Sequence, residues 1–248
     1  MADLSRLQAA MSSGGLVLFV ELPGNSAELA RVVEQSGADS LLLQLFNEHP
    51  VTGAYTGGPD LETPQIKDIL STLKLPVGIH LGNLKTITRE DWEQVVALGF
   101  DYAAIGVTKL PPFVLRDRRL PLLSYVPPGM PFEYYHALSE YDNIIALSFE
   151  TSSQVQTEGT NRFNVVDLVT LTLVSKLSGG KPVIFRVSQD VTGDDVQGLF
   201  DAGCRGLLLD PAYTGASADF FKVYTEQFRE AVDAVKKKTV FRAHFPWG

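Results

Sequence analysis

The sequence predicts a single (β/α)8 barrel, also called a TIM barrel, over residues 1–248, and three observations support this fold class. Eight short apolar runs recur along the chain, and its 248 residues match the usual size of one such barrel. The runs alternate with segments of helical periodicity, and several of these segments end in glycine just before the next run. The runs are almost continuously apolar, which is typical of parallel strands that helices cover on both faces.

The eight runs are the expected strands of the barrel. They span residues 16–22, 40–45, 77–81, 102–107, 120–126, 144–150, 183–188 and 206–210. An open, doubly wound sheet would also alternate strands and helices, but no G-x-G-x-x-G motif follows the first run. We therefore favour the closed barrel.

Side-chain oxygens and prolines mark the expected helix starts, because both suit the first helical turn. The start signals are Ser26, Thr63 with Pro64, Thr88 with Asp91, Pro131, and Thr192 with Asp195. Residues 109–119 leave room for only a short helix, so the fourth helix is expected to be irregular. The connections 46–62 and 151–163 are rich in Gly, Thr, Ser and Asn, which favours mobile surface loops.

Composition argues against several classes of function. The net charge of -8, with both signs mixed along the chain, offers no basic patch for nucleic acid. The first residues lack the pattern of a secretory signal, and no later run is long enough to span a bilayer. We therefore expect a cytoplasmic protein with no membrane partner. The single cysteine, Cys204, rules out an internal disulfide and is expected to be a buried packing thiol.

Polar residues stand at nearly every expected strand end on the carboxyl side, where barrels of this kind place their active sites. They are Glu21, Gln44, His80, Thr108, Ser124 or Tyr125, Glu150, Arg186 with Ser188, and Asp210. Residues two apart in a strand share a face, and small neighbours indicate the lumen. By this test His80, Thr108 and Glu150 face the lumen, whereas Glu21 shares its face with Val17 and Phe19 and its direction is less clear.

Several kinds of catalysis lack their usual residues in this chain. The only lysine in an expected strand region is Lys181, at an amino end, so a Schiff-base nucleophile is not obvious. No zinc-ligand spacing, phosphate-binding Walker loop or G-x-S-x-G motif occurs. Glu21, Glu150 and Asp210 would suit a hard divalent metal such as magnesium, although nothing in the sequence requires a metal.

The last quarter of the chain, residues 183–215, resembles the end of phosphate-binding (β/α)8 barrels. This superfamily includes ribulose-phosphate, tryptophan-synthesis and some flavin-binding barrels. The resemblance implies a phosphate cradle of backbone N–H groups around the last two strands. The substrate-binding residues that we assign on this basis, together with the strand ends, are Gln44, Arg186, Ser188, Gln189, Gly193, Thr214, Gly215 and Ala216. The chain departs from the family pattern at Ser188-Gln189-Asp190 and Asp210-Pro211, where the family usually has glycine.

Three functions remain open at this point. The first is an enzyme, an isomerase or lyase, acting on a small phosphorylated or carboxylated metabolite by general acid and base catalysis. Its catalytic residues would be Glu21, His80, Glu150 and Asp210.

The second is a non-catalytic barrel that binds a ligand or partner, with Arg186 paired to Glu150 or Asp210 in a self-satisfied polar layer. The third is a flavin-dependent oxidoreductase that holds FMN through the same phosphate end. The last helix, with Phe220, Phe221 and Tyr224, would suit a homodimer face as readily as a barrel-packing face.

Overall fold

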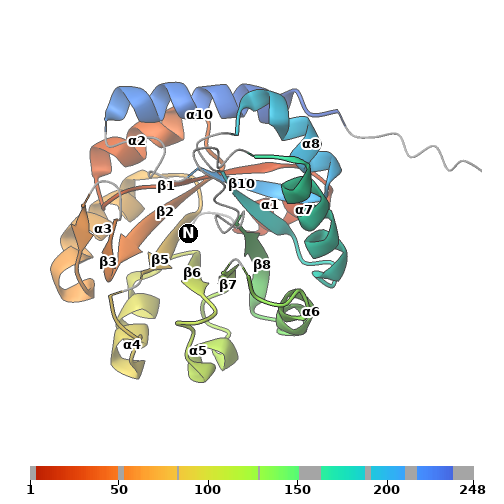
Figure 1. Cartoon of the computed structure of the whole chain (residues 1–248). Helices are drawn as coiled ribbons and strands as arrows, with labels where there is room; N and C mark the ends of the chain where they lie inside the picture. The colour runs from red at the N-terminus through yellow and green to blue at the C-terminus, as the bar shows by residue number, and fades with distance from the viewer. Residues whose placement is uncertain are drawn as a thin grey trace, which may run out of the picture.

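The computed structural model describes residues 4–49, 53–82, 84–127, 129–150, 163–187, 191–209 and 217–236. Eight parallel strands close into a barrel in the order β1-β10-β9-β8-β7-β6-β5-β2. Figure 1 shows the helices arranged around this barrel, with α2 and α10 side by side over one part of it. The predicted (β/α)8 fold with parallel strands is confirmed.

Each barrel strand coincides with one of the eight apolar runs. The strands are β1 (Val17–Glu21), β2 (Ser40–Leu45), β5 (Val77–Leu81), β6 (Tyr102–Gly106), β7 (Leu122–Val126), β8 (Ile144–Phe149), β9 (Val183–Val187) and β10 (Cys204–Leu209). They differ from the predicted ranges only by one or two residues at the ends. Nearly every strand residue is buried, as expected of a sheet covered on both faces.

The helices pack around the outside of the barrel, apart from α1, which lies at the amino ends of the strands (Figure 1). They are α1 (Leu4–Ser12), α2 (Ala27–Gln35), α3 (Pro59–Thr72), α4 (Arg89–Leu98), α5 (Pro112–Arg116), α6 (Glu133–Ser139), α7 (Val165–Leu177), η1 (Gly193–Asp195) with α8 (Val196–Asp201), and α10 (Ala218–Asp233). Ser26 caps α2, and Thr88 with Asp91 forms a capping box on α4, as predicted. The short α5 confirms the irregular fourth helix.

The segment that follows β2 was predicted to be a mobile surface loop, but part of it forms regular structure. Residues Asn47–Glu48 (β3) pair with Tyr55–Thr56 (β4) in an antiparallel hairpin, and Asn47 and Thr56 are buried. Helix α3 then begins at Pro59 rather than at the predicted Thr63-Pro64, which places Pro64 inside the helix. The reason is that Pro59 already suits the first helical turn. In the hairpin, the hydroxyl of the buried Thr56 bonds to the backbone of Asn47.

Helix α1, which the sequence did not predict, packs Leu7 and Met11 against the lumen residues at the amino ends of the strands. The lumen-facing side chains alternate along each strand, as predicted. The apolar ones are Val17, Phe19, Leu42, Tyr102, Ala104, Leu123, Tyr125, Ala146, Ile184 and Leu208. Gly78 leaves room for the ring of Tyr102, because a Cβ there would lie 2.4 Å from that ring.

Cys204 and Asp117, which lie away from the carboxyl ends of the strands, have shifted pKa values. Cys204 is fully buried, which raises the pKa of its thiol to about 11, and its S–H donates to the carbonyl oxygen of Gly206 at 2.9 Å. Hydrogen bonds from Arg119 hold the pKa of Asp117 well below its usual range. Asp117 also accepts a 2.8 Å hydrogen bond from the indole N–H of the buried Trp92. The buried cysteine is confirmed, and Asp117 joins α4 to the region after α5.

The outer surface bears on two further expectations. On α10, Phe221 is fully buried and packs on the barrel, whereas Phe220 is 45% exposed. The buried Phe221 accounts for the barrel-packing role, and the homodimer face stays a prediction. Among the helices that the structure describes, none has the length and apolar character needed to cross a bilayer.

Candidate active site

The carboxyl ends of the strands bring four predicted side chains into one cluster. Because residues two apart share a face, Glu21, His80, Glu150 and Arg186 lie on the lumen side of β1, β5, β8 and β9 or at their ends. Contacts between the side chains, described below, confirm that all four converge. Glu21, whose direction was uncertain from the sequence, points inward with the others.

Glu21 is the centre of this cluster. Its side chain is 1% exposed. One carboxylate oxygen, Oε1, is in short contact with Nδ1 of His80 and accepts a 3.3 Å hydrogen bond from Nε2 of Gln44. The other, Oε2, lies 3.0 Å from Nη2 of Arg186. A buried carboxylate is costly unless it is paired, so these contacts are what hold Glu21 in the lumen.

The contact between Glu21 and His80 fixes the orientation of the imidazole. A carboxylate only accepts hydrogen bonds, so Nδ1 of His80 carries the proton that is donated to Glu21. In the neutral ring the remaining nitrogen, Nε2, then has a free lone pair. His80 is partly exposed, with 18% of its side chain accessible, so this nitrogen belongs to a ring that solvent or a ligand can reach. The arrangement is that of an oriented general base.

Arg186 joins the two carboxylates of the cluster. Its Nε lies 3.1 Å from Oε1 of Glu150, while its Nη2 contacts Glu21. Glu150 is 38% exposed and stands at the outer edge of the site. The guanidinium carbon lies 5.5 Å from the centre of the Tyr125 ring, within the range of a cation–π contact. The predicted pairing of Arg186 with Glu150 is confirmed, and its contact with Glu21 is an addition.

Gln44 supports Glu21 and is itself held by residues that the sequence analysis did not select. Its Nε2 also donates to the carbonyl oxygen of Leu22 at 2.6 Å, and its Oε1 accepts a short hydrogen bond from Asn47. Asn25 bonds the backbone of Gln44 on both its N–H and its carbonyl side, at 3.0 and 2.8 Å. Gln44 therefore acts through Glu21 rather than at the mouth of the site.

The inward turn of Asn47 depends on the residue before it. Phe46 has a positive φ of 54°, a left-handed conformation that is uncommon for a bulky side chain. This turn brings Asn47 back toward Gln44 directly after β2. No sequence signal marked it, because glycine or asparagine is the usual residue in this conformation.

Tyr125 and Ser148 complete the lumen near the cluster. Tyr125 was one of two candidates on its strand, and it faces the lumen, whereas Ser124 lies on the opposite face of β7. Its ring lies 5.2 Å from the ring of His80, centre to centre. Tyr125 and Ser148 are register partners on β7 and β8. Both hydroxyl oxygens are buried and have no hydrogen-bond partner within the part of the chain that the structure describes.

The predicted phosphate cradle is only partly within the described residues. Ser188, Gln189, Asp210, Thr214, Gly215 and Ala216 lie outside them. Gly193 begins η1, where a Cβ would meet Ala231 of α10 at 3.3 Å, so the structure places it against the outer helix layer. No described contact joins Gly193 to the Glu21 cluster. Thr192 and Asp195 form the predicted capping box beside it.

The metal hypothesis named Glu21, Glu150 and Asp210, and Asp210 lies outside the described residues. Within the described ranges, no group of three or more His, Cys, Asp or Glu side chains is arranged to hold a metal ion. Glu21 and Glu150 both contact the guanidinium of Arg186, which already supplies a positive charge between them.

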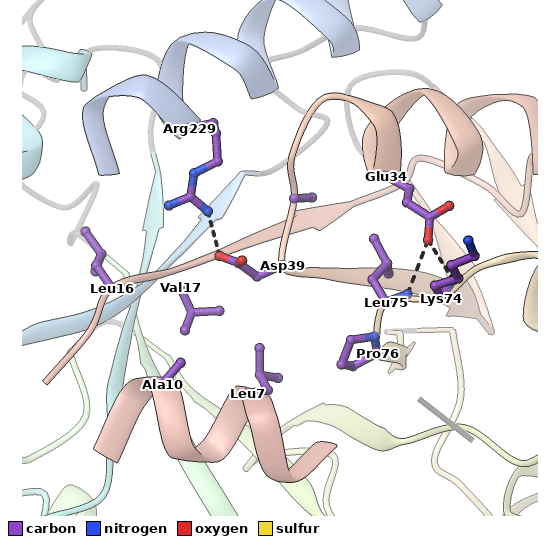
Figure 2. A pocket seen from close by; sticks show the side chains of 11 residues that line it. Leu7, Ala10, Leu16, Val17, Glu34, Asp39, Lys74, Leu75, Pro76 and Arg229 are labelled. Carbon is purple, nitrogen blue, oxygen red and sulfur yellow. Dashed lines mark hydrogen bonds and ion pairs between the residues drawn. The ribbon is translucent and has the colours of Figure 1, made fainter. Parts of the chain in front are cut away.

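A cavity of about 620 Å³ lies at the opposite, amino-terminal end of the barrel, between α1 and the starts of β1, β2 and β5 (Figure 2). Three of its charged side chains, those of Glu34, Asp39 and Arg229, are bonded within the protein. Asp39 pairs with Arg229 at 2.9 Å and accepts the N–H of Leu18 at 2.8 Å, and Glu34 accepts the N–H of Lys74 at 2.6 Å. These contacts tie helices to strand starts and indicate a structural role for this end.

Comparison with known proteins finds relatives in fold alone. No protein-family model matches the chain, and no curated protein matches it. Among solved structures, thiamine phosphate pyrophosphorylase from Pyrococcus furiosus is 14% identical with a TM-score of 0.61, over 88% of this chain and 95% of that one.

Phospho-2-dehydro-3-deoxyheptonate aldolase from Thermotoga maritima is 13% identical with a TM-score of 0.65, over 89% and 70% of the two chains. Phosphoribosyl anthranilate isomerase from Thermus thermophilus is 14% identical with a TM-score of 0.59, over 89% and 100%. These solved structures share the barrel architecture over most of this chain. At these identities the likeness shows a shared fold.

Proposed function

We propose that the chain is an enzyme that isomerises or cleaves a small phosphorylated or carboxylated metabolite by general acid and base catalysis. The observation that carries this proposal is the buried Glu21, which holds Nδ1 of His80 and leaves Nε2 in a partly exposed ring at the carboxyl end of the barrel. Names of structural neighbours, among them an isomerase, an aldolase and a pyrophosphorylase of phosphorylated compounds, support the same class.

In this proposal His80 moves the proton. Nε2 accepts a proton from a carbon or oxygen of the substrate, and the positive charge that forms on the ring is stabilised by Glu21. Microscopic reversibility lets the same nitrogen return the proton at the product position. Glu150, which is more exposed, would serve as a second acid or base at the outer edge of the site.

Arg186 would orient the anionic part of the substrate. A guanidinium matches the planar geometry of carboxylate and phosphate with two parallel hydrogen bonds. Its contacts with Glu21 and Glu150 hold the side chain in the lumen. Preorganisation of this kind is what acid and base catalysis requires, because the reacting groups must be within hydrogen-bond reach.

The test is a screen for proton exchange with solvent. The protein is incubated in D2O with a panel of sugar phosphates, 2-oxo acids and hydroxy acids, and loss of C–H signals is followed by ¹H NMR. We expect at least one compound to exchange with the wild-type protein, and the rate to fall by about 10² to 10⁴-fold in His80→Gln. His136→Gln, on the exposed face of α6, is the matched control. A panel that shows no exchange with wild type contradicts the proposal.

A non-catalytic barrel that binds a ligand or partner is the second candidate. It is favoured by one observation, that Glu21, His80, Arg186 and Glu150 satisfy one another without any substrate. This candidate predicts that anions bind at Arg186 while no compound of the panel exchanges protons. The same NMR samples therefore separate the two functions.

A further inference from the structure

The hydroxyl of Tyr125 is a buried hydrogen-bond donor that the described part of the protein does not use. Tyr125 is 9% exposed, and its oxygen is shielded from solvent without a hydrogen-bond partner among the described residues. Buried polar groups are almost always bonded, and leaving one unbonded costs free energy. Such a group in a native structure calls for a partner that the described part of the protein does not supply.

The position of Tyr125 limits what that partner can be. Its ring packs against the ring of His80 at 5.2 Å and lies under the guanidinium of Arg186 at 5.5 Å. The side chain thus stands between the proposed base and the proposed anion-binding group. A partner that bonds the hydroxyl would therefore lie in the lumen, close to His80 and Arg186.

The neighbouring strands leave space beside Tyr125. In register with it are Gly106 on β6 and Ser148 on β8. Among the described residues, a Cβ placed on Gly106 would meet only Oγ1 of Thr108, at 4.0 Å. The hydroxyl of Ser148 is likewise buried and without a partner in the described ranges. The space at Gly106 and the unused hydroxyl of Ser148 therefore lie on opposite sides of Tyr125, on the lumen side of β6 and β8.

Burial sets the chemical character of the tyrosine. Loss of solvation raises the pKa of the Tyr125 hydroxyl well above its ordinary value, and the negative charge of Glu21 raises it further. The phenol therefore keeps its proton in neutral solution and acts as a donor. A fixed donor in a site shielded from water is most effective toward an oxygen that gains negative charge during a reaction.

We propose that Tyr125 is a catalytic residue that donates its hydroxyl hydrogen bond to a carbonyl oxygen of the substrate, and that the substrate is a small carbonyl compound bearing a carboxylate or phosphate. This inference rests on the proposed acid and base function of His80. The C–H bond next to the carbonyl breaks, its proton goes to Nε2 of His80, and its electron pair forms a C=C bond. The carbonyl π electrons move to oxygen, and the enolate oxygen accepts the hydrogen bond from Tyr125. When the carbon that loses its proton carries a hydroxyl group, the proton of that hydroxyl passes to the enolate oxygen. His80 then returns its proton from Nε2 to the former carbonyl carbon, the hydroxyl-bearing carbon becomes the new carbonyl, and the isomerisation is complete.

The primary test is Tyr125→Phe, which removes one hydroxyl and keeps the ring against His80. We expect the rate of C–H exchange to fall by about 10² to 10³-fold, the usual loss when one donor to a developing oxyanion is removed. Ser124→Ala is the matched control, because Ser124 also has a buried hydroxyl with no partner among the described residues but faces away from the lumen. Its exchange rate should stay within twofold of wild type.

Thermal melting of the free protein checks the structural premise. Since the Tyr125 hydroxyl has no hydrogen bond to lose within the described part of the chain, Tyr125→Phe should melt at the wild-type temperature or above it. A clear fall in melting temperature would show that the hydroxyl is bonded within the protein, which would overturn the inference.

Binding of two enolate mimics, oxalate and 2-phosphoglycolate, separates this inference from the proposed function. By calorimetry we expect at least one mimic to bind wild type about 10-fold more tightly than Tyr125→Phe, with inorganic phosphate unchanged within twofold. If the mimics bind the variant more weakly and the wild type shows no proton exchange, the Tyr125 contact is supported and the proposed catalytic function is refuted. Proton exchange that requires His80 but is unchanged in Tyr125→Phe supports the proposed catalytic function and refutes the role of Tyr125. Equal binding of both mimics by the two proteins also refutes the role of Tyr125.

Discussion

Replacement of Arg186 by methionine tests whether the cluster at the strand ends is held together by one guanidinium. The change removes the cation that lies 3.0 Å from Glu21 and 3.1 Å from Glu150 and keeps an apolar chain of similar length. Breaking a buried ion pair by removing one partner costs about 3–5 kcal/mol of unfolding free energy. Glu150 is 38% exposed and adds less than about 1 kcal/mol, so the cost comes mainly from Glu21.

His80 and Gln44 still donate to Glu21 in this variant, which favours the lower end of the range. We therefore expect a loss of about 3 kcal/mol, equivalent to a fall of roughly 6–12 °C in melting temperature for a chain of this length. Circular dichroism melts of wild type and Arg186→Met measure it directly. Arg118→Met is the control, because Arg118 is 76% exposed and pairs only with the exposed Asp142 among described residues, so its melting temperature should hardly change.

The double variant Glu21→Leu with Arg186→Met sharpens the interpretation. If the two side chains act as a pair, the double variant is less destabilised than the sum of the single changes, because the unpaired buried charge has been removed. An unchanged melting temperature in Arg186→Met would refute the reasoning and leave Arg186 as a ligand anchor alone. In that case inorganic phosphate should raise the melting temperature of wild type but not of the variant.

Three further outcomes are expected elsewhere in the barrel. Gly78→Ala should lower stability by about 1–3 kcal/mol in urea unfolding, because its methyl group would meet the Tyr102 ring, whereas Gly106→Ala, where space is open, should stay within about 0.5 kcal/mol. Cys204, buried and with its pKa raised to about 11, should react with a disulfide reagent only in denaturant; rapid labelling of native protein would contradict this. Asp117→Ala should cost about 1–3 kcal/mol at pH 7 by leaving the buried indole without an acceptor. The pKa of Asp117 in the folded protein lies below the value near 3.9 of the unfolded chain. The ionised carboxylate therefore contributes its full stabilisation to the folded state above about pH 3.9, and this stabilisation is lost as the pH falls toward the pKa of the folded protein. Melts from pH 7 to pH 2 should therefore show the variant and wild type converging, and a constant gap would count against it.

The strands and their inward faces could be predicted because strand periodicity is local. A period of two placed His80 and Glu150 in the lumen, since their neighbours on the same face are small. Glu21 shares its face with Val17 and Phe19, so size alone left its direction open. Its inward position follows from pairing with groups on other strands, which lie far away in the sequence.

The features that the sequence did not predict depend on contacts between distant residues or on an uncommon backbone conformation. Asn47 reaches Gln44 only because Phe46 adopts a positive φ, which its residue type does not indicate. Helix α1 precedes the first strand and lies outside the repeat of strand and helix, and its placement depends on the open amino end of the barrel that Leu7 and Met11 cover. Such features follow from the assembled fold rather than from any local pattern.

The two ends of the lumen differ in how their polar groups are satisfied, and this difference bears on where chemistry can occur. Toward the amino end, the hydroxyl of Tyr102 is bonded to Ser40 at 2.7 Å and α1 covers the layer below. Toward the carboxyl end, the hydroxyls of Tyr125 and Ser148 have no such partner among the described residues. An unbonded buried hydroxyl destabilises the free protein, and a ligand that bonds it removes that cost on binding. A ligand that bonds these hydroxyls would therefore bind more tightly at the carboxyl end of the barrel. His80 and Arg186 converge at the same end.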